Sequence, residues 1–164
     1  ESWAKQIPDL LGAGFRVLAI DFRGFGESRG ESREAAHHLD VLAAVHYLQK
    51  DGATPVAVIG GSFGGAAAAA AAIEEPGSIE RLVLLGATPD PPHEKLTTRK
   101  LYIATRDDAN AAGPRLPGLQ AHLARTPEPK ELVLLPGSAH AQFMFDTDLG
   151  PRVMSEILRF LAAP

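Results

Sequence analysis

The sequence predicts an α/β fold in which a mostly parallel sheet is covered by helices on both faces. Short apolar runs of β type alternate with longer helical patterns along the chain. Each apolar run is nearly continuous, as expected of a strand that is buried on both sides. Alternating strands and helices imply right-handed crossovers between parallel strands. With 164 residues, of which 45% are hydrophobic, residues 1–164 are predicted to form a single domain.

The predicted strands are the apolar runs, and their order along the chain determines where function is expected. In an open parallel sheet, reactive groups lie on the loops at the carboxyl ends of the strands. The loop after each run is therefore a candidate site. The predicted strands are Arg16–Asp21, Pro55–Gly60, Arg81–Gly86, Lys100–Thr105 and Glu131–Leu135.

The predicted helices fill the intervals before and between these strands. The first ends at a pair of glycines, and the third is stopped by Pro76-Gly77, since neither residue type favours a helix. The second has apolar residues at helical spacing. The predicted helices are Ser2–Leu11, Arg33–Lys50, Phe63–Glu74, Leu116–Ala124 and Arg152–Leu161.

Composition excludes several classes of function. The net charge is −4, which argues against a general nucleic-acid binder or a membrane-surface binder, because both need a basic face. The absence of cysteine excludes disulfides, thiolate metal sites and a cysteine nucleophile. It is compatible with the cytoplasmic location that we expect, but does not require it. Carboxylates and histidines are not clustered at ligand spacing, so we expect neither a metal nor an organic cofactor.

The loop after the second predicted strand carries a candidate nucleophile. It reads Gly60-Gly61-Ser62-Phe63-Gly64-Gly65, which matches the pattern G-x-S-x-G. A serine on a sharp turn between a strand and a helix is held in a strained conformation with its hydroxyl above the sheet. We expect Gly60 and Gly64 to lie close together in such a turn. The alternative is an ordinary glycine-rich loop, but a strand before it and a helix after it favour the nucleophile.

A nucleophilic serine needs a base and a carboxylate that orients the base. The acid is expected after the fourth strand, where Asp107 and Asp108 are adjacent and one of them can serve only as a turn cap. The base is expected after the last strand, where His140 follows small residues. The remaining histidines are weaker candidates because they lie within predicted helices or a proline-rich loop. They are His37, His38, His46, His93 and His122.

With these residues in place, the chain resembles the α/β-hydrolase family, in its compact esterase or dienelactone-hydrolase-like branch. The segment Asp21–Ser28 is similar to the D-x-R-G-x-G-x-S turn of that family, where Asp21 and Arg23 would stabilise the turn rather than catalyse. The segment Thr105–Asp108 matches the turn whose last residue is the triad acid, so the resemblance favours Asp108 over Asp107. The order Ser62, Asp108, His140 is the order used by the family. Dienelactone hydrolases proper use cysteine, so Ser62 points toward esterases.

The resemblance also implies what surrounds the triad. One oxyanion donor would be the backbone N–H of Phe63, and the family's other donor follows a strand that precedes residue 1, so we expect the chain to lack the N-terminal part of the fold. The interval Thr88–Arg99 is too short for a helical lid, which predicts an open and shallow acyl site.

These observations predict a serine hydrolase that cleaves a small-molecule carboxylic ester through an acyl-enzyme, without binding nucleic acid or membrane. The same triad would serve a thioesterase, an amidase or a lactonase, because the sequence specifies the nucleophile better than the leaving group. A non-catalytic hydrolase-like domain is the alternative from a different class.

Overall fold

The computed structural model describes residues 3–31 and 36–163, and its centre is a parallel sheet. The strands β1 (Ala57–Gly61), β2 (Arg81–Leu85), β3 (Arg99–Thr105) and β6 (Lys130–Leu135) lie in the order β1-β2-β3-β6, and every neighbouring pair is parallel. The predicted fold class is thereby confirmed. All of their carboxyl ends meet at one edge of the sheet.

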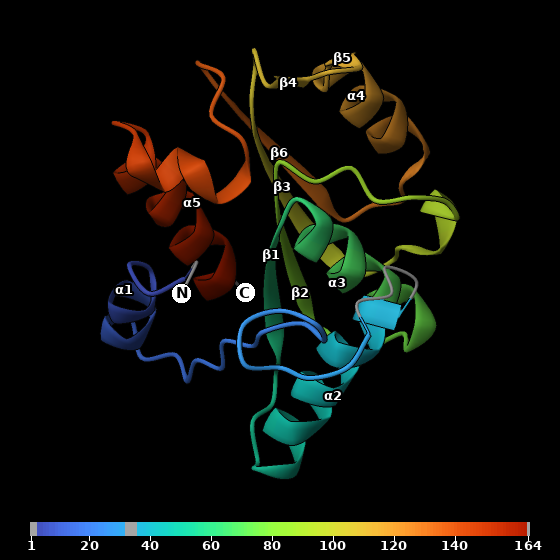
Figure 1. Ribbon diagram of the computed structural model, residues 1–164, viewed down its shortest axis with the longest axis vertical. Coiled ribbons are helices and arrows are strands. Elements are labelled where there is room, and N and C mark those ends of the chain that lie inside the picture. The colour runs from blue at the N-terminus through green and yellow to red at the C-terminus, as the bar shows by residue number, and fades with distance from the viewer. Residues whose placement is uncertain (1–2, 32–35, 164) are drawn as a thin grey trace.

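Helices cover both faces of this sheet (Figure 1). On one face lie α2 (His37–Lys50), α3 (Phe63–Glu74) and α4 (Leu116–Arg125). On the other lie α1 (Ile7–Gly12) and α5 (Gly150–Ala162). The remaining short elements are the turns η2 (His93–Lys95) and η3 (Ala141–Asp146) and the small hairpin of β4 (Ala109–Asn110) and β5 (Gly113–Pro114).

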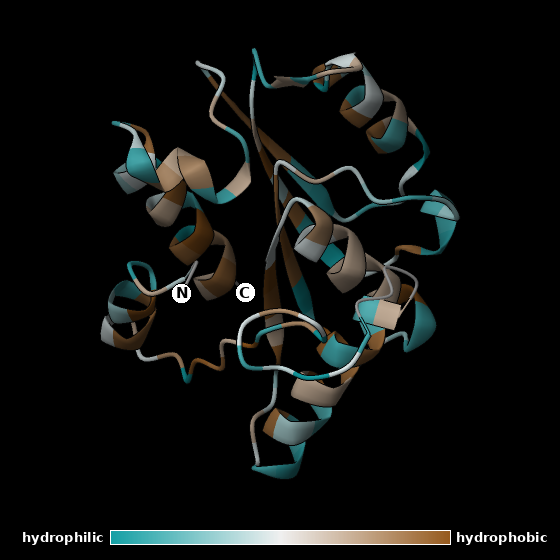
Figure 2. Ribbon diagram, viewed as in Figure 1, coloured by the Kyte–Doolittle hydropathy of each residue, from teal (hydrophilic) through white to brown (hydrophobic). Residues whose placement is uncertain are grey.

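The two central strands are apolar on both faces, which explains their continuous apolar sequence. Leu82 and Leu84 of β2 belong to the core under α2 and α3, whereas Val83 and Leu85 belong to the core under α5. Successive side chains of a strand point to opposite faces, so a strand covered on both sides needs no polar positions. Figure 2 shows the central strands mostly in the hydrophobic colour.

Helix α3 packs close to the sheet because its side chains are small. Ala68, Ala69 and Ala71 are completely buried between α2 and the sheet. A Cβ added to Gly65 would lie 2.6 Å from the Cβ of Ala87, so that position has no room for a side chain. The small residues after Ser62 therefore let the first turn of α3 approach the sheet.

One predicted strand is wrong. Residues 16–21 form no strand, and β1 is the edge of the sheet within the described part of the chain. Val17 packs against the core under α5, but Leu18 is 40% exposed. The apolar run correctly indicated partial burial, yet a strand also requires a neighbour for its backbone hydrogen bonds, and none pairs with this segment.

The start of the first helix differs from the prediction. The first helix begins at Ile7 with Pro8 in its first turn, where the missing N–H of proline costs no hydrogen bond. Its predicted start at Ser2, and the predicted start of the second helix at Arg33, lie outside the described residues. The helices from Leu116 and from Gly150 agree with the predicted segments within two residues at either end.

Candidate active site

Ser62 lies at the junction of β1 and α3, in a backbone conformation that serine rarely adopts. Its φ is 51° and its ψ is −122°, outside the regions favoured by residues other than glycine. Its N–H donates a hydrogen bond of 2.9 Å to the carbonyl oxygen of Leu85 at the end of β2. The strained turn is therefore held against the centre of the sheet.

Glycines make this turn sterically possible. A Cβ on Gly60 would lie 2.6 Å from the carbonyl oxygen of Gly64 and 2.6 Å from the Cα of Gly65. The residues on either side of Ser62 thus approach each other as expected. At Gly64 itself, an added Cβ would meet only Phe22 at 3.5 Å, an ordinary contact. The second glycine that the packing requires is Gly65 rather than Gly64.

His140 follows β6 and reaches across the sheet to Ser62. Its Nε2 lies 2.8 Å from Ser62 Oγ, and its Nδ1 lies 2.6 Å from Asp108 Oδ2. The next residue, Ala141, is fully buried with a φ of 50°, which is unfavourable for alanine. The imidazole thus bridges a hydroxyl and a carboxylate that come from different loops.

The structure distinguishes the two adjacent aspartates. Asp108 is 3% exposed and bonds to His140, whereas Asp107 is exposed, and its backbone N–H donates to the carbonyl oxygen of Gly137. The structure therefore brings Asp108, and not Asp107, to the imidazole.

Backbone and side-chain hydrogen bonds fix the loop that carries His140. Thr105 Oγ1 donates to the carbonyl oxygen of Ala139 at 2.9 Å, and Arg106 N–H donates to that of Leu135 at 2.8 Å. Both donors lie at the end of β3, next to Asp108. The loops that carry the carboxylate and the imidazole are therefore joined.

Phe63 is the first residue of α3, so its backbone N–H is among those that have no partner within a helix. The positive end of the helix macrodipole lies at this point and favours a developing negative charge. The side chain of Phe63 is 44% exposed.

Three of the other histidines bond to residues outside the Ser62–His140–Asp108 chain. His38 and His46 on α2 pair with Glu74 and Glu75 at 2.7 Å each. His122 is 2% exposed and contacts Tyr102 Oη at 2.7 Å and His93 Nδ1 at 2.8 Å. Burial, followed by the neighbouring charge of His93, lowers the pKa of His122 to about 4. It is a neutral member of a buried network near neutral pH.

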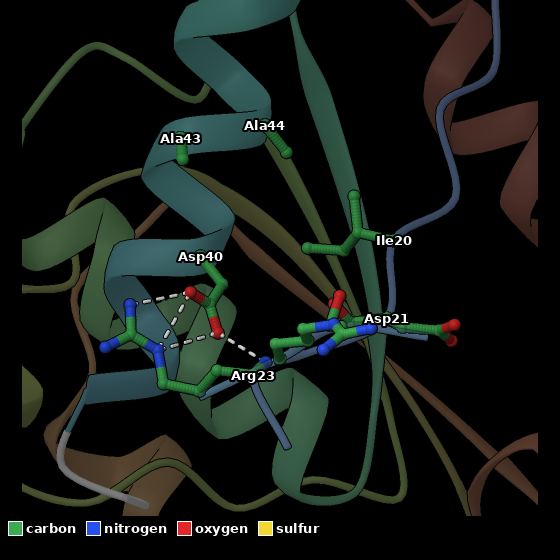
Figure 3. Close-up of a pocket in the computed structure, with 8 residues that line it drawn as sticks. Ile20, Asp21, Arg23, Asp40, Ala43 and Ala44 are labelled. Atoms are coloured by element: carbon green, nitrogen blue, oxygen red, sulfur yellow. Dashed lines mark hydrogen bonds and ion pairs between the residues drawn. The ribbon is translucent and has the colours of Figure 1, made fainter. Parts of the chain in front are cut away.

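Beside the sheet, a surface pocket lies between α2 and the segment 20–29 (Figure 3). Arg23 and Asp40 form an ion pair there at 2.7 Å, and hydrogen bonding to Arg23 lowers the pKa of Asp40. This agrees with a turn-stabilising role for Arg23. None of the residues that line the pocket is Ser62, Asp108 or His140.

Two further properties concern only residues 3–31 and 36–163. No group of three or more histidine, aspartate or glutamate side chains is arranged there to hold a metal ion. No helix in these ranges has the length and apolar character needed to cross a bilayer.

Comparison with known proteins decides the family. The model of the α/β-hydrolase fold family matches residues 1–146. The chain belongs to this family. The α/β-hydrolase chain is 38% identical over 86 residues to the bifunctional epoxide hydrolase 2 of Sus scrofa, a match that covers 51% of this chain and 16% of that protein.

A further curated relative of this α/β hydrolase and a structural neighbour have different named activities. It is 32% identical over 114 residues to the putative carbamate hydrolase RutD of Variovorax paradoxus, covering 69% of this chain and 42% of that protein. An esterase of Pyrococcus furiosus has a similar fold, with a TM-score of 0.79 at 20% identity over 98% of this chain and 76% of that one. The chain spans less than a fifth of the first curated relatives it matches.

Sequence reasoning on this α/β hydrolase missed two residues at the site. Gly86, after β2, has a φ of 55°, and an added Cβ would lie 3.1 Å from His140 Nδ1. Arg115 Nε lies 3.4 Å from Asp108 Oδ1. The position of Gly86 at a strand end was a usable signal, whereas nothing in the sequence pairs Arg115 with Asp108.

Proposed function

We propose that this α/β hydrolase is a serine esterase of the compact, dienelactone-hydrolase-like branch, with Ser62 as the nucleophile, His140 as the base and Asp108 as the acid. The observation that carries the proposal is the continuous hydrogen-bonded chain from Asp108 Oδ2 through both nitrogens of His140 to Ser62 Oγ, at 2.6 Å and 2.8 Å. These contacts come from three different loops and are those that a nucleophilic serine requires.

The proposed reaction has two steps. Ser62 Oγ attacks the ester carbonyl carbon while His140 Nε2 takes the hydroxyl proton, and the resulting oxyanion accepts a hydrogen bond from the N–H of Phe63. The tetrahedral intermediate expels the alcohol, which takes the proton from His140. Water then attacks the acyl-enzyme with His140 as base, which releases the carboxylic acid and restores Ser62. Asp108 holds the imidazole in the tautomer that accepts the proton.

The named activities of relatives raise a second candidate, the hydrolysis of epoxides. Attack by a serine hydroxyl on an epoxide would form an alkyl ether, and an activated water does not readily cleave an ether. An acyl-serine is an ester and can be hydrolysed. With serine at the nucleophile position, acyl transfer is the reaction that restores the free enzyme. Thioesters, amides and lactones are the other substrates that this reaction could use.

The test is covalent labelling with a fluorophosphonate, mapped by mass spectrometry, together with hydrolysis of p-nitrophenyl acetate. We expect one label on Ser62, and loss of label and hydrolysis in Ser62→Ala. Ser138→Ala is the matched control, because Ser138 is exposed on the loop that carries His140. A label on another residue would contradict Ser62 as the nucleophile, and equal hydrolysis by Ser62→Ala and the native chain would favour a non-catalytic domain. Turnover of styrene oxide would contradict the argument against epoxides.

A further inference from the structure

Two exposed aromatic rings lie beside the candidate nucleophile. Phe63 is 44% exposed and Phe25 is 46% exposed. Their rings are stacked, with centroids 5.7 Å apart and planes inclined by 25°. We call Phe25 and Phe63 the aromatic platform. A single exposed phenylalanine needs no explanation, but two stacked rings next to a reactive hydroxyl form a continuous apolar surface.

The platform is supported from behind by other rings. Phe22 and His37 pack against Phe63 with centroid distances of 5.2 Å and 5.5 Å, and His37 also lies 6.0 Å from Phe25. Tilted and edge-on contacts of this kind are favourable arrangements for aromatic pairs. The exposed rings therefore belong to a packed cluster with fixed positions.

The turn that carries Phe25 places it outward by hydrogen bonds. Phe25 N–H donates to the carbonyl oxygen of Phe22, and Ser28 N–H donates to that of Phe25, both at 2.9 Å. Ser28 Oγ donates to the carbonyl oxygen of Asp21 at 2.7 Å, which joins the two ends of the turn. As a result, Phe22 points into the protein and Phe25 points to solvent.

The same turn is anchored to α2. Arg23 Nη2 donates to Asp40 Oδ1 at 2.7 Å and Arg23 Nε donates to Asp40 Oδ2 at 3.1 Å, while the backbone N–H of Arg23 donates to Asp40 Oδ2 at 2.9 Å (Figure 3). Bidentate pairs of this kind fix orientation as well as distance. The ion pair of Arg23 with Asp40 therefore holds the turn that carries Phe25 in position.

The platform and His140 approach Ser62 from different parts of the fold. All the ring contacts of Phe63 given above are with α2 and the turn at Phe22 and Phe25, whereas His140 comes from the loop after β6. In the proposed reaction, the leaving alcohol must reach His140 to be protonated. An acyl group that extended away from His140 would lie on the side of Phe63 and its ring partners.

We propose that the aromatic platform binds the acyl group of the ester and that Phe25 determines specificity for apolar acyl chains. This inference rests on the proposed esterase function. A longer acyl chain would cover more of the exposed rings of Phe25 and Phe63 than an acetyl group does. Burial of each added methylene against an apolar surface favours the longer substrate.

The test measures kcat/KM for p-nitrophenyl acetate, butanoate and hexanoate with the native chain, Phe25→Ala and Phe25→Leu. We expect the preference for hexanoate over acetate to fall about tenfold in Phe25→Ala and less in Phe25→Leu. Tyr47→Ala is the matched control, since Tyr47 is an aromatic residue of α2 that is 62% exposed. A second series of methyl, butyl and hexyl acetates varies only the alcohol. Circular dichroism confirms that each variant is folded.

The outcomes separate this inference from the proposed function. If the native chain hydrolyses no ester, the esterase proposal fails and the acyl site fails with it. If the esters are hydrolysed but Phe25→Ala and Phe25→Leu keep the native acyl preference, the platform is overturned and the esterase stands. A change confined to the alcohol series would overturn its assignment to the acyl group.

Discussion

Gly86 and His140 meet with no space for a side chain between them. A Cβ on Gly86 would lie 2.8 Å from the backbone nitrogen of Ala141 and 3.1 Å from Nδ1 of His140, the atom that bonds to Asp108. Gly86 also has a φ of 55°. The end of β2 therefore forms the surface on which the imidazole rests.

Gly86→Ala is expected to displace His140. A shift of about 1 Å in a reacting group can cost on the order of 10²-fold in rate, and we expect a loss of that size in kcat/KM for p-nitrophenyl acetate. Gly137→Ala is the control, because Gly137 has a φ of 93° but nothing within 4 Å of an added Cβ. Similar losses in both variants would show that backbone strain, and not the contact with His140, is responsible.

Asp108→Asn is expected to lower kcat by about 10⁴-fold, because an amide favours the wrong tautomer of the imidazole. Asp107→Asn should change kcat by less than about threefold, since Asp107 is exposed and only its backbone bonds to Gly137. Steady-state kinetics on the two variants provide the measurement. A larger loss in Asp107→Asn would reverse the assignment of the acid.

Gly65→Ala is expected to destabilise the fold. The added methyl would lie 2.6 Å from Ala87 Cβ and 3.0 Å from the carbonyl oxygen of Gly60, and overpacking of this kind costs about 1–3 kcal/mol in the free energy of unfolding. Gly118→Ala in α4 has open space and should stabilise by about 0.5–1 kcal/mol. Urea unfolding measures both. Equal effects would contradict the close packing of α3 on the sheet.

The buried His122 should make stability depend on pH in the acidic range. Its pKa is lowered from 6.5 to about 4 in the folded chain, so between these values the unfolded chain binds the proton and the folded chain does not. The contribution of His122 to the free energy of unfolding is fully present above pH 6.5. It is lost as the pH falls toward 4, by up to about 3 kcal/mol. His122→Gln should remove this loss, whereas His46→Gln on the exposed face of α2 should retain it. Urea midpoints between pH 7 and pH 4 test this, and an unchanged slope in His122→Gln would refute it.

The sequence predicted the parallel sheet because burial on both faces leaves a continuous apolar pattern, as in β2. It also predicted the positions of Ser62 and His140, because both follow a strand end. The prediction of a strand at residues 16–21 was wrong because an apolar run indicates that a segment is buried, and does not indicate that another strand pairs with it. Gly86 and Arg115 were missed because their contacts depend on how distant loops meet, which no local pattern records.

Hydrogen bonds between the end of β3 and the loop after β6 join the segments that carry two members of the candidate triad. Asp108 and His140 are mounted on segments that are tied to each other, whereas Ser62 is tied to Leu85 of β2. Strand β2 is joined to β3 by its parallel pairing and by the hydrogen bond of 2.8 Å from the N–H of Gly86 to the carbonyl oxygen of Ile103. A substitution that weakens this pairing would therefore act first on the contact between the Ser62 hydroxyl and the imidazole, and only later on the contact between the imidazole and the carboxylate.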